Sequence, residues 1–448
     1  MCAKQNECKV NHKGSPTLFC CLLLAGGMVR ADNITVANVT LVSASPTESI
    51  VQFDIAWDNS WRTVLKADDA STENWDAAWV FVDYHLKEQS GAWRRATLAK
   101  DGHQAPADAT IAVGTSGADD AAFGAGVFIH RSAVGEAGPN DWKGVKLRWL
   151  HPPSDESSGA AGETGAIDTN TTIPEVTAIE MVYVPQGAFW AGDGLTTRGR
   201  FTKTQITQAD PTTDGGRPAG ALAPENGNTL WPNGYKGFYC MKSEITHRDF
   251  LRFQKALADP RFALYPPRKD LTDPPDRNAP RGWLSWHDGA GFAAWAGLRP
   301  MTELEYEKAG RGPLAPVAGE YAWGSTNRLP AAVAAAAASN SGVSREQTGA
   351  SFWGILDLSG GLWDRVVTLD DARDYPTDQG RRFRGTHGTG SPDLPDDWPD
   401  TEGNGAGFRG GAAGLAPVHM GISDRYSAAY GNGSRGMRNG FRAVRTAP

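Results

Sequence analysis

The stretch SWHDGAGFAAWAGLRPMTELEYEKAGRG, residues 285–312, contains two signals for the start of a helix. Ser285 and Thr302 are each followed three residues later by an acidic residue. In such a capping box, the hydroxyl and the acid side chain satisfy two backbone N–H groups that would otherwise lack partners. We therefore expect two short helices here, the first ended by Gly297 and the second by Gly310.

Around this stretch, residues 179–448 mix short strands with short helices. EMVYVPQGAFWAGD (180–193) and KGFYCMKSEIT (236–246) have the composition of strands, and Thr246 starts a third capping box with Asp249. The 448-residue chain contains 53 Gly and 28 Pro, which interrupt helices too often for a helical bundle. The expected fold class of this region is therefore α+β, with many loops.

The preceding region, residues 32–151, has the period of two that is typical of half-buried antiparallel strands. Apolar and polar residues alternate in 51–57 and in 145–149, and WVFVDYHL (79–86) and GVFIH (126–130) are further strand candidates. We expect a small β-sandwich of the immunoglobulin-like kind, with its tryptophans in the core.

Between the two regions, residues 152–178 contain almost no large apolar side chains and many Pro, Gly, Ser and Thr residues. Such a segment cannot bury enough apolar surface to offset the entropy lost when it is ordered. We expect it to be a linker between a β-sandwich domain over 32–151 and a second domain over 179–448.

Residues 1–31 have the pattern of a cleavable signal peptide, with cleavage near Ala31. Lysines precede the apolar run TLFCCLLLAGGMV (17–29), which is shorter than the roughly 20 residues that span a bilayer. We expect a protein that is secreted or held in the cell envelope. It would meet a membrane only during export or through a leader that is retained as an anchor.

Charge and cysteine content narrow the class of protein further. The net charge is -7 and the basic residues are scattered, so the basic stripe that nucleic-acid binding requires is missing. Cys240 is the only cysteine after the leader, so the mature chain cannot form an internal disulfide. These features suit a bacterial surface protein that does not bind nucleic acid.

Several separate motifs occur in the order and spacing of one known family. They are residues 285–312, YAWG (321–324), FWGILDLSGGLWDRV (352–366), RGG (409–411) and GFRAVR (440–445). Together they resemble the formylglycine-generating enzyme, or sulfatase-modifying factor, family. The resemblance implies a C-type-lectin-like fold for residues 179–448, with most tryptophans acting as scaffold.

The resemblance also implies copper chemistry that this chain lacks the residues to perform. The family's enzyme oxidises a substrate cysteine with a pair of late cysteines that bind copper, and a soft metal of this kind needs thiolate ligands. No cysteine follows Cys240, which lies in the middle of a predicted strand. We therefore expect no catalytic residues and no copper.

The resemblance also raises the question of whether the chain binds iron or calcium. A related branch, the iron-dependent sulfoxide synthases, binds iron through clustered histidines, but the histidines here show no ligand-like spacing. Family members also bind calcium near an Asn in a turn where this chain has Gly361. We therefore expect no resident cofactor, with calcium as the one metal left open.

The C-terminal tail, residues 423–448, has the composition of a contact surface. Tyr gives rigid amphipathic area, and Ser, Gly and Asn give adaptable hydrogen bonds, as in antibody-like binding surfaces. The tail resembles the variable proteins of diversity-generating retroelements, in which exposed C-terminal positions vary on a fixed scaffold. The expected ligand-binding residues are Tyr426, Ser427, Tyr430, Asn432, Ser434, Met437 and Asn439, with Trp363 and Arg365 beneath them.

The sequence therefore favours a secreted or surface protein that binds a protein or glycan ligand without catalysis. Its C-terminal surface would be diversified among siblings if the second resemblance holds. The alternative is a metal-dependent oxidoreductase of the formylglycine-generating enzyme and sulfoxide synthase family that uses an unrecognised metal site.

Overall fold

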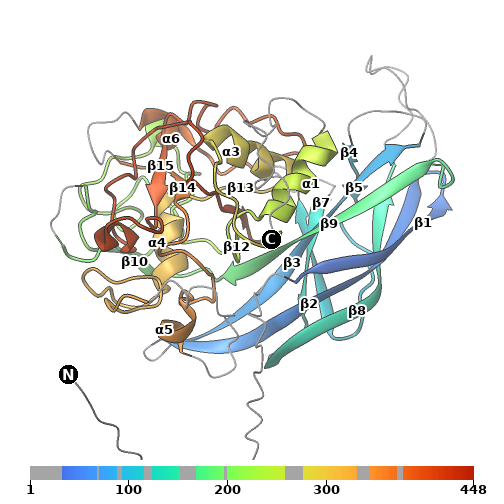
Figure 1. Ribbon diagram of the computed structural model, residues 1–448, viewed down its shortest axis with the longest axis horizontal. Coiled ribbons are helices and arrows are strands. Elements are labelled where there is room, and N and C mark those ends of the chain that lie inside the picture. The colour runs from blue at the N-terminus through green and yellow to red at the C-terminus, as the bar shows by residue number, and fades with distance from the viewer. Residues whose placement is uncertain are drawn as a thin grey trace, which may run out of the picture.

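The computed structural model is built mostly of β-structure with few helices (Figure 1). It describes residues 33–67, 70–87, 93–115, 124–151, 168–195, 199–257, 276–329, 344–370 and 377–448. The predicted leader over 1–31 lies outside these residues. Among the helices of these ranges, none has the length and apolar character needed to cross a bilayer.

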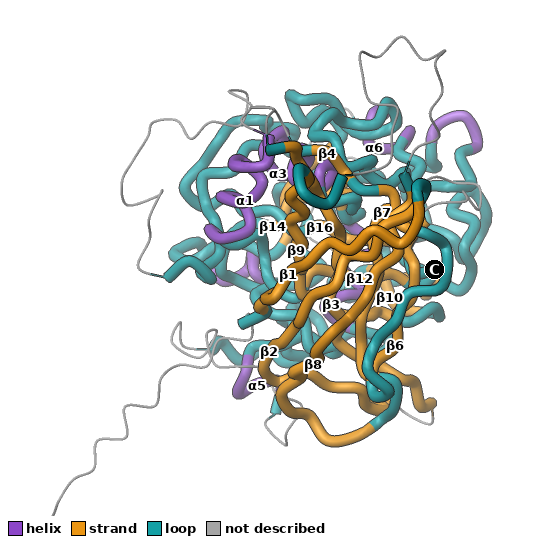
Figure 2. Tube along the Cα trace, turned by 90° about the vertical axis from the view of Figure 1, so that its right-hand side faces the viewer, coloured by secondary structure: helices purple, strands orange, loops and turns teal. Residues whose placement is uncertain are grey.

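The N-terminal region consists of strands, as the alternating pattern predicted. In Figure 2, β1, β2 and β8 lie side by side across the face turned to the viewer, in agreement with their pairing. A further pairing between β2 and β3 closes the strand order β2-β8-β5-β7-β3 on itself. These strands therefore form one closed sheet, where the sequence predicted a β-sandwich of two sheets. The strands are β1 (Thr35–Ser45), β2 (Glu48–Ala67), β3 (Ala70–Leu86), β4 (Arg94–Arg95), β5 (Thr97–Leu98), β6 (Ala109–Thr115), β7 (Gly124–Arg131) and β8 (Gly135–Leu150).

Strand β3 is buried on both of its faces. Its even-numbered residues, such as Val80, pack with β2, β7 and β8 in one core, while Trp79 and Phe81 point into a second core that contains the helices. The indole N–H of Trp79 donates to the carbonyl of Ala296 at 2.8 Å. The uninterrupted apolar run in 79–82, which lies in a predicted strand, is thus explained by burial on two sides.

The same sheet continues into the C-terminal region. β9 (Thr172–Val184) pairs with β3 on one edge and with β12 (Phe238–Met241) on the other. Next in order come β16 (Ala443–Thr446) and β13 (Arg299–Pro300). The linker predicted over 152–178 therefore ends earlier than expected, because 172–178 are strand, and residues 152–167 lie outside the described ranges. The two predicted domains share one hydrogen-bonded sheet.

The helices are short and lie with the loops on one side of the sheet (Figure 1). All three predicted capping boxes are confirmed, since hydroxyl and acid exchange hydrogen bonds with backbone N–H groups at each site. The helices are α1 (His247–Leu257), α3 (Trp286–Trp295), α4 (Glu303–Arg311), α5 (Arg345–Thr348) and α6 (Asp378–Arg382), with 3-10 turns η1 (Glu225–Gly227) and η3 (Pro417–Met420).

One helix end differs from the prediction. Gly297, with φ of 68°, follows α3 as expected, but α4 continues past Gly310 to Arg311 and ends at Gly312, with φ of 72°. Gly310 serves packing instead, because a Cβ at this position would lie 2.7 Å from the side chain of Ile422.

Two small ribbons complete the strands. β10 (Phe189–Ala191) pairs with β11 (Thr204–Ile206), and β14 (Asp364–Val367) pairs with β15 (Ala406–Arg409). The second ribbon lies directly beneath the tail, because Phe408 donates its backbone N–H to the carbonyl of Ser427. It provides the base on which the predicted contact surface rests.

Candidate ligand-binding surface

The tail is fixed at both ends by buried groups. At its start, the guanidinium of Arg425 is buried and donates to both carboxylate oxygens of Glu303, at 2.7 and 3.0 Å. At its end, Phe441 and Val444 are fully buried, and β16 pairs with β12. These buried residues form the framework that holds the tail. The segment between the two anchors, residues 426–439, is referred to below as the display segment.

Arg365, on β14, holds the display segment from below. Its guanidinium donates to the carbonyl of Asn432 at 2.7 Å and to that of Ser434 at 2.9 Å, and it lies 4.4 Å from the ring centre of Phe408. Burial lowers the pKa of Arg365 to about 9, so the group stays charged at neutral pH. Because Arg365 is buried, it positions the loop and offers no surface to a ligand.

Three large side chains of the display segment are exposed to solvent. Tyr426 is 46% exposed, Tyr430 is 40% exposed and Met437 is 58% exposed. Ser434 is also exposed, and Ser427 is half-buried. Large amphipathic side chains held in the open by a fixed backbone are typical of contact surfaces.

The two predicted asparagines partly serve the loop itself. The side-chain oxygen of Asn432 accepts the backbone N–H of Ser434 at 2.9 Å, and the Asn439 amide donates to the Ser434 carbonyl at 3.3 Å. The backbone of Asn439 also forms a parallel bridge with Trp363. Both asparagines therefore stabilise the conformation of the display segment through their own side chains.

An aromatic cluster joins the two exposed tyrosines. Trp363 is half-buried, and its ring centre lies 5.9 Å from that of Phe408 and 6.3 Å from that of His419. His419 in turn lies 4.5 Å from Tyr426, and Phe408 lies 6.4 Å from Tyr430. Phe408 and His419 were not predicted from the sequence, because only the fold brings β15 and η3 next to the tail.

A polar groove lies beside Tyr430. Its other side is formed by the start of α3 and by the loop before β15, and Arg435 ties the two sides together through two 2.6 Å hydrogen bonds to the Asp288 carboxylate. None of the residues from outside the tail was predicted. The lining residues are Ser285, His287, Thr401, Glu402, Asn404, Tyr430, Gly431, Asn432, Gly433 and Ser434.

Cys240 is placed where thiol chemistry is disfavoured. It lies in β12, is fully buried, and its pKa is raised to about 12, mainly by burial. Thiolate is the reactive form and the metal-binding form of cysteine. Within the residues that the structure describes, no three His, Cys, Asp or Glu side chains gather as a metal-binding group.

Comparison with known proteins agrees with the motifs. Residues 168–447 match the family of the sulfatase-modifying factor enzyme 1-like domain. A formylglycine-generating enzyme from Streptomyces coelicolor is 47% identical over 57 residues, which cover 13% of this chain and 17% of that enzyme. Among solved structures, Treponema denticola variable protein 1 is similar with a TM-score of 0.34 and 14% identity, over 60% of this chain and 96% of that chain.

Proposed function

The chain belongs to the sulfatase-modifying factor enzyme 1-like domain family, and we propose that it uses this scaffold to bind a ligand without catalysis. In this proposal a C-type-lectin-like domain, preceded by the N-terminal strands that share its sheet, presents residues 426–439 to a protein or glycan. The observation that carries the proposal is the exposure of Tyr426, Tyr430 and Met437 on a backbone that buried groups hold in place.

The cysteine content supports binding over the family's oxidation chemistry. Cys240 is the only thiol after residue 31, and its burial keeps it protonated and away from solvent. The paired thiolates that the resemblance requires for copper therefore have no counterpart in the tail.

The separation of anchors from exposed side chains supports diversification of the display segment. Arg365 contacts only backbone carbonyls of this segment, at Asn432 and Ser434. A change of side chain at Tyr426, Tyr430 or Met437 therefore leaves these anchoring bonds in place. Sequences of sibling copies test the idea, since variation concentrated in 426–439 is expected and uniform siblings would contradict it.

Binding itself is tested with the full chain on arrays of defined glycans and of purified surface proteins. We expect a specific signal that the variant Tyr426→Ala/Tyr430→Ala reduces by about tenfold or more, because Tyr side chains dominate such contacts. Val64→Ala, an exposed change on β2, serves as the control. Equal signals from the tail variant and the native chain would overturn the assignment of the surface.

The alternative function is that of a metal-dependent oxidoreductase. The observation in its support is the similarity of 57 residues to a formylglycine-generating enzyme. Metal analysis of the purified protein separates the two functions. We expect neither copper nor iron in stoichiometric amount and no requirement for a resident cofactor, with calcium analysed in the same experiment. One equivalent of copper or iron per chain would replace the binding proposal with the oxidoreductase.

Export is part of the proposal, because a display surface acts on partners outside the cell. We propose that residues 1–31 are removed near Ala31 and that the mature protein is secreted or held in the cell envelope. N-terminal sequencing of protein from the native host tests this, and a mature chain that retains residues 1–31 in the cytoplasm would contradict it.

A further inference from the structure

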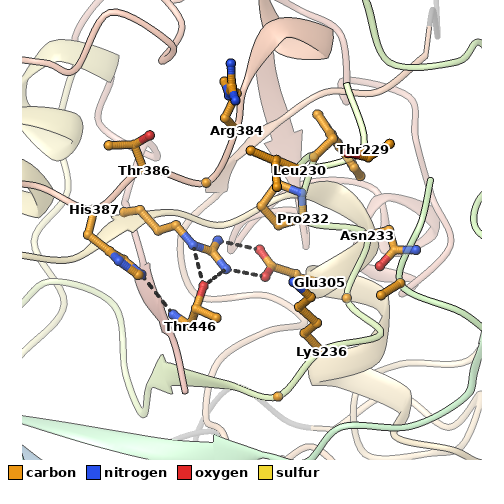
Figure 3. A pocket seen from close by; sticks show the side chains of 16 residues that line it. Thr229, Leu230, Pro232, Asn233, Lys236, Glu305, Arg384, Thr386, His387 and Thr446 are labelled. Atoms are coloured by element: carbon orange, nitrogen blue, oxygen red, sulfur yellow. Dashed lines mark hydrogen bonds and ion pairs between the residues drawn. The ribbon is translucent and has the colours of Figure 1, made fainter. Parts of the chain in front are cut away.

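A second pocket lies at the end of β16, apart from the display segment (Figure 3). Its cavity volume of about 420 Å³ is sufficient for a small organic molecule. Thr446 of β16, Arg299 of β13 and Glu305 of α4 line it together with residues from two loops. The two loops contribute Leu230, Pro232, Lys236, Arg384 and His387 to the lining.

The floor of the pocket is a fixed ion pair. Arg299 donates to both carboxylate oxygens of Glu305, at 2.8 and 2.6 Å, and also to the hydroxyl of Thr446 at 3.1 and 3.3 Å (Figure 3). Both charged groups are buried. Since Glu305 is neutralised by Arg299, it does not repel an anion that enters the pocket.

Two hydrogen-bond donors remain available above this floor. The Nε2 atom of His387 accepts the backbone N–H of Thr446 at 3.1 Å, so the ring proton of the neutral imidazole is on Nδ1. Burial, together with Arg445 and Arg299, keeps the pKa of His387 well below its usual value. No described residue accepts a hydrogen bond from His387 Nδ1 or from the Thr446 hydroxyl.

The rim of the pocket carries positive charge. Lys236 and Arg384 are both exposed, and within the described ranges no carboxylate forms an ion pair with either side chain. The carboxylate of Asp397 accepts the backbone N–H of Arg384 at 2.7 Å. It forms no ion pair with the Arg384 guanidinium. The charges of Arg299 and Glu305 cancel, whereas those of Lys236 and Arg384 do not. The lining of the pocket therefore carries a net positive charge, although the net charge of the chain is -7.

We propose that this pocket binds a small organic anion that combines a carboxylate with an apolar body. The carboxylate accepts from His387 Nδ1 and the Thr446 hydroxyl and is attracted by Lys236 and Arg384. The apolar body packs against Leu230 and Pro232, which form the opposite wall in Figure 3. Charge-assisted hydrogen bonds of this kind favour an anion over its neutral analogue of the same shape.

The experiment uses the full chain and two probes of matched shape, benzoate and benzamide. Binding is followed by NMR through the imidazole signals of His387, which are assigned with the variant His387→Gln. We expect benzoate to shift these signals and to bind about tenfold more tightly than benzamide. Inorganic phosphate, which lacks a ring, is expected to bind more weakly than benzoate.

Variants separate this pocket from general attraction of anions. Lys236→Gln/Arg384→Gln is expected to weaken benzoate binding about tenfold. Lys66→Gln/Arg328→Gln, which makes the same chemical changes at exposed positions elsewhere, is expected to have no effect, and so is Tyr430→Ala in the display segment. Equal affinity for benzamide, unmoved His387 signals, or full affinity in the Lys236/Arg384 variant would overturn the proposal.

Discussion

The N-terminal strands, residues 33–150, and the C-terminal region, residues 168–448, fill their interiors with different side chains. In the strands, the largest fully buried side chains are the tryptophans Trp57, Trp61, Trp79 and Trp149. In the C-terminal region, the largest fully buried side chains are two tryptophans and six arginines: Trp231, Trp286, Arg299, Arg311, Arg365, Arg409, Arg425 and Arg442.

The difference follows from where backbone hydrogen bonds can be made. Strands satisfy their carbonyls within the sheet, so their side chains are free to be apolar. Loops have no such ladder, and a guanidinium with five N–H donors can serve several carbonyls at once. Arg442 donates to the carbonyls of Lys242 and Leu356, which lie outside the strands, at 3.0 and 2.8 Å.

The C-terminal region therefore depends on buried charge, whereas the N-terminal region depends on buried apolar volume. Buried charges destabilise a protein strongly when one partner is removed, because the other is left without compensation. Four substitutions test this contrast, from the largest expected effect to the smallest.

Arg409→Met breaks the charge network. Arg409 contacts Glu307 at 2.8 Å, Glu303 at 3.2 Å and the Ile422 carbonyl at 2.6 Å. Its loss removes one of the cations that compensate these two buried carboxylates and takes away the donor to the Ile422 carbonyl. We expect the free energy of unfolding, measured in urea, to fall by about 3–5 kcal/mol. Arg438→Met, the same change at an exposed site, is the control, and equal losses from both would contradict the contrast.

Leu147→Ala tests the apolar core of the strands. Leu147 on β8 is fully buried among apolar side chains, and its truncation leaves a cavity. We expect a loss of roughly 3 kcal/mol in the free energy of unfolding. Leu222→Ala, at an exposed leucine, should cost far less. A Leu147→Ala protein as stable as the control would show that this region does not depend on apolar packing.

Lys308→Met tests the role of buried charge through the pH dependence of the free energy of unfolding. Burial lowers the pKa of Lys308 from 10.5 to about 7, so between these values the unfolded chain binds more protons than the folded chain. Stability therefore rises with pH in this window, by up to about 1.4 kcal/mol per unit. In urea unfolding at pH 7, 8 and 9, the native chain should gain stability relative to Lys308→Met as the pH rises.

The control for this measurement is Lys66→Met, at an exposed lysine on β2. Its difference from the native chain should stay constant over the same pH range. A constant difference for Lys308→Met as well would mean that Lys308 keeps its charge in the folded protein.

Met437→Ala is expected to have the smallest effect. Met437 is 58% exposed, so its truncation should change the free energy of unfolding by at most about 0.5 kcal/mol. Thermal unfolding of the variant beside Leu147→Ala provides the check. A loss as large as that of Leu147→Ala would mean that Met437 belongs to the core and is not available for display.

Local signals predicted the elements well where a few neighbouring residues are sufficient. A capping box needs only two residues three positions apart, and all three predicted boxes formed. Alternation placed β2 and β8 correctly, because burial on one face requires it. The end of α4 was predicted incorrectly, because Gly310 was interpreted as a helix stop. A glycine is needed there because the side chain of Ile422 leaves no room for a Cβ, and neighbouring residues in the sequence do not indicate this distant contact.

The candidate sites were predictable only in part. The composition of the tail identified Tyr426 and Tyr430, but not Phe408 and His419, which belong to other elements and lie next to the tyrosines in the fold. The second pocket was not predicted at all. Its donors His387 and Thr446 are 59 positions apart and carry no shared motif.

The amino-acid sequence alone determined the periodicities, the helix starts, the single thiol after residue 31 and the polar, aromatic composition of the tail, because each depends on residue type and short spacing. Only the tertiary structure decided that one sheet joins the two regions and that Arg365 lies beneath the display segment. It also decided which side chains line the pocket. Burial and hydrogen-bond pairing depend on partners distant in the chain, and the folded backbone alone brings these partners together.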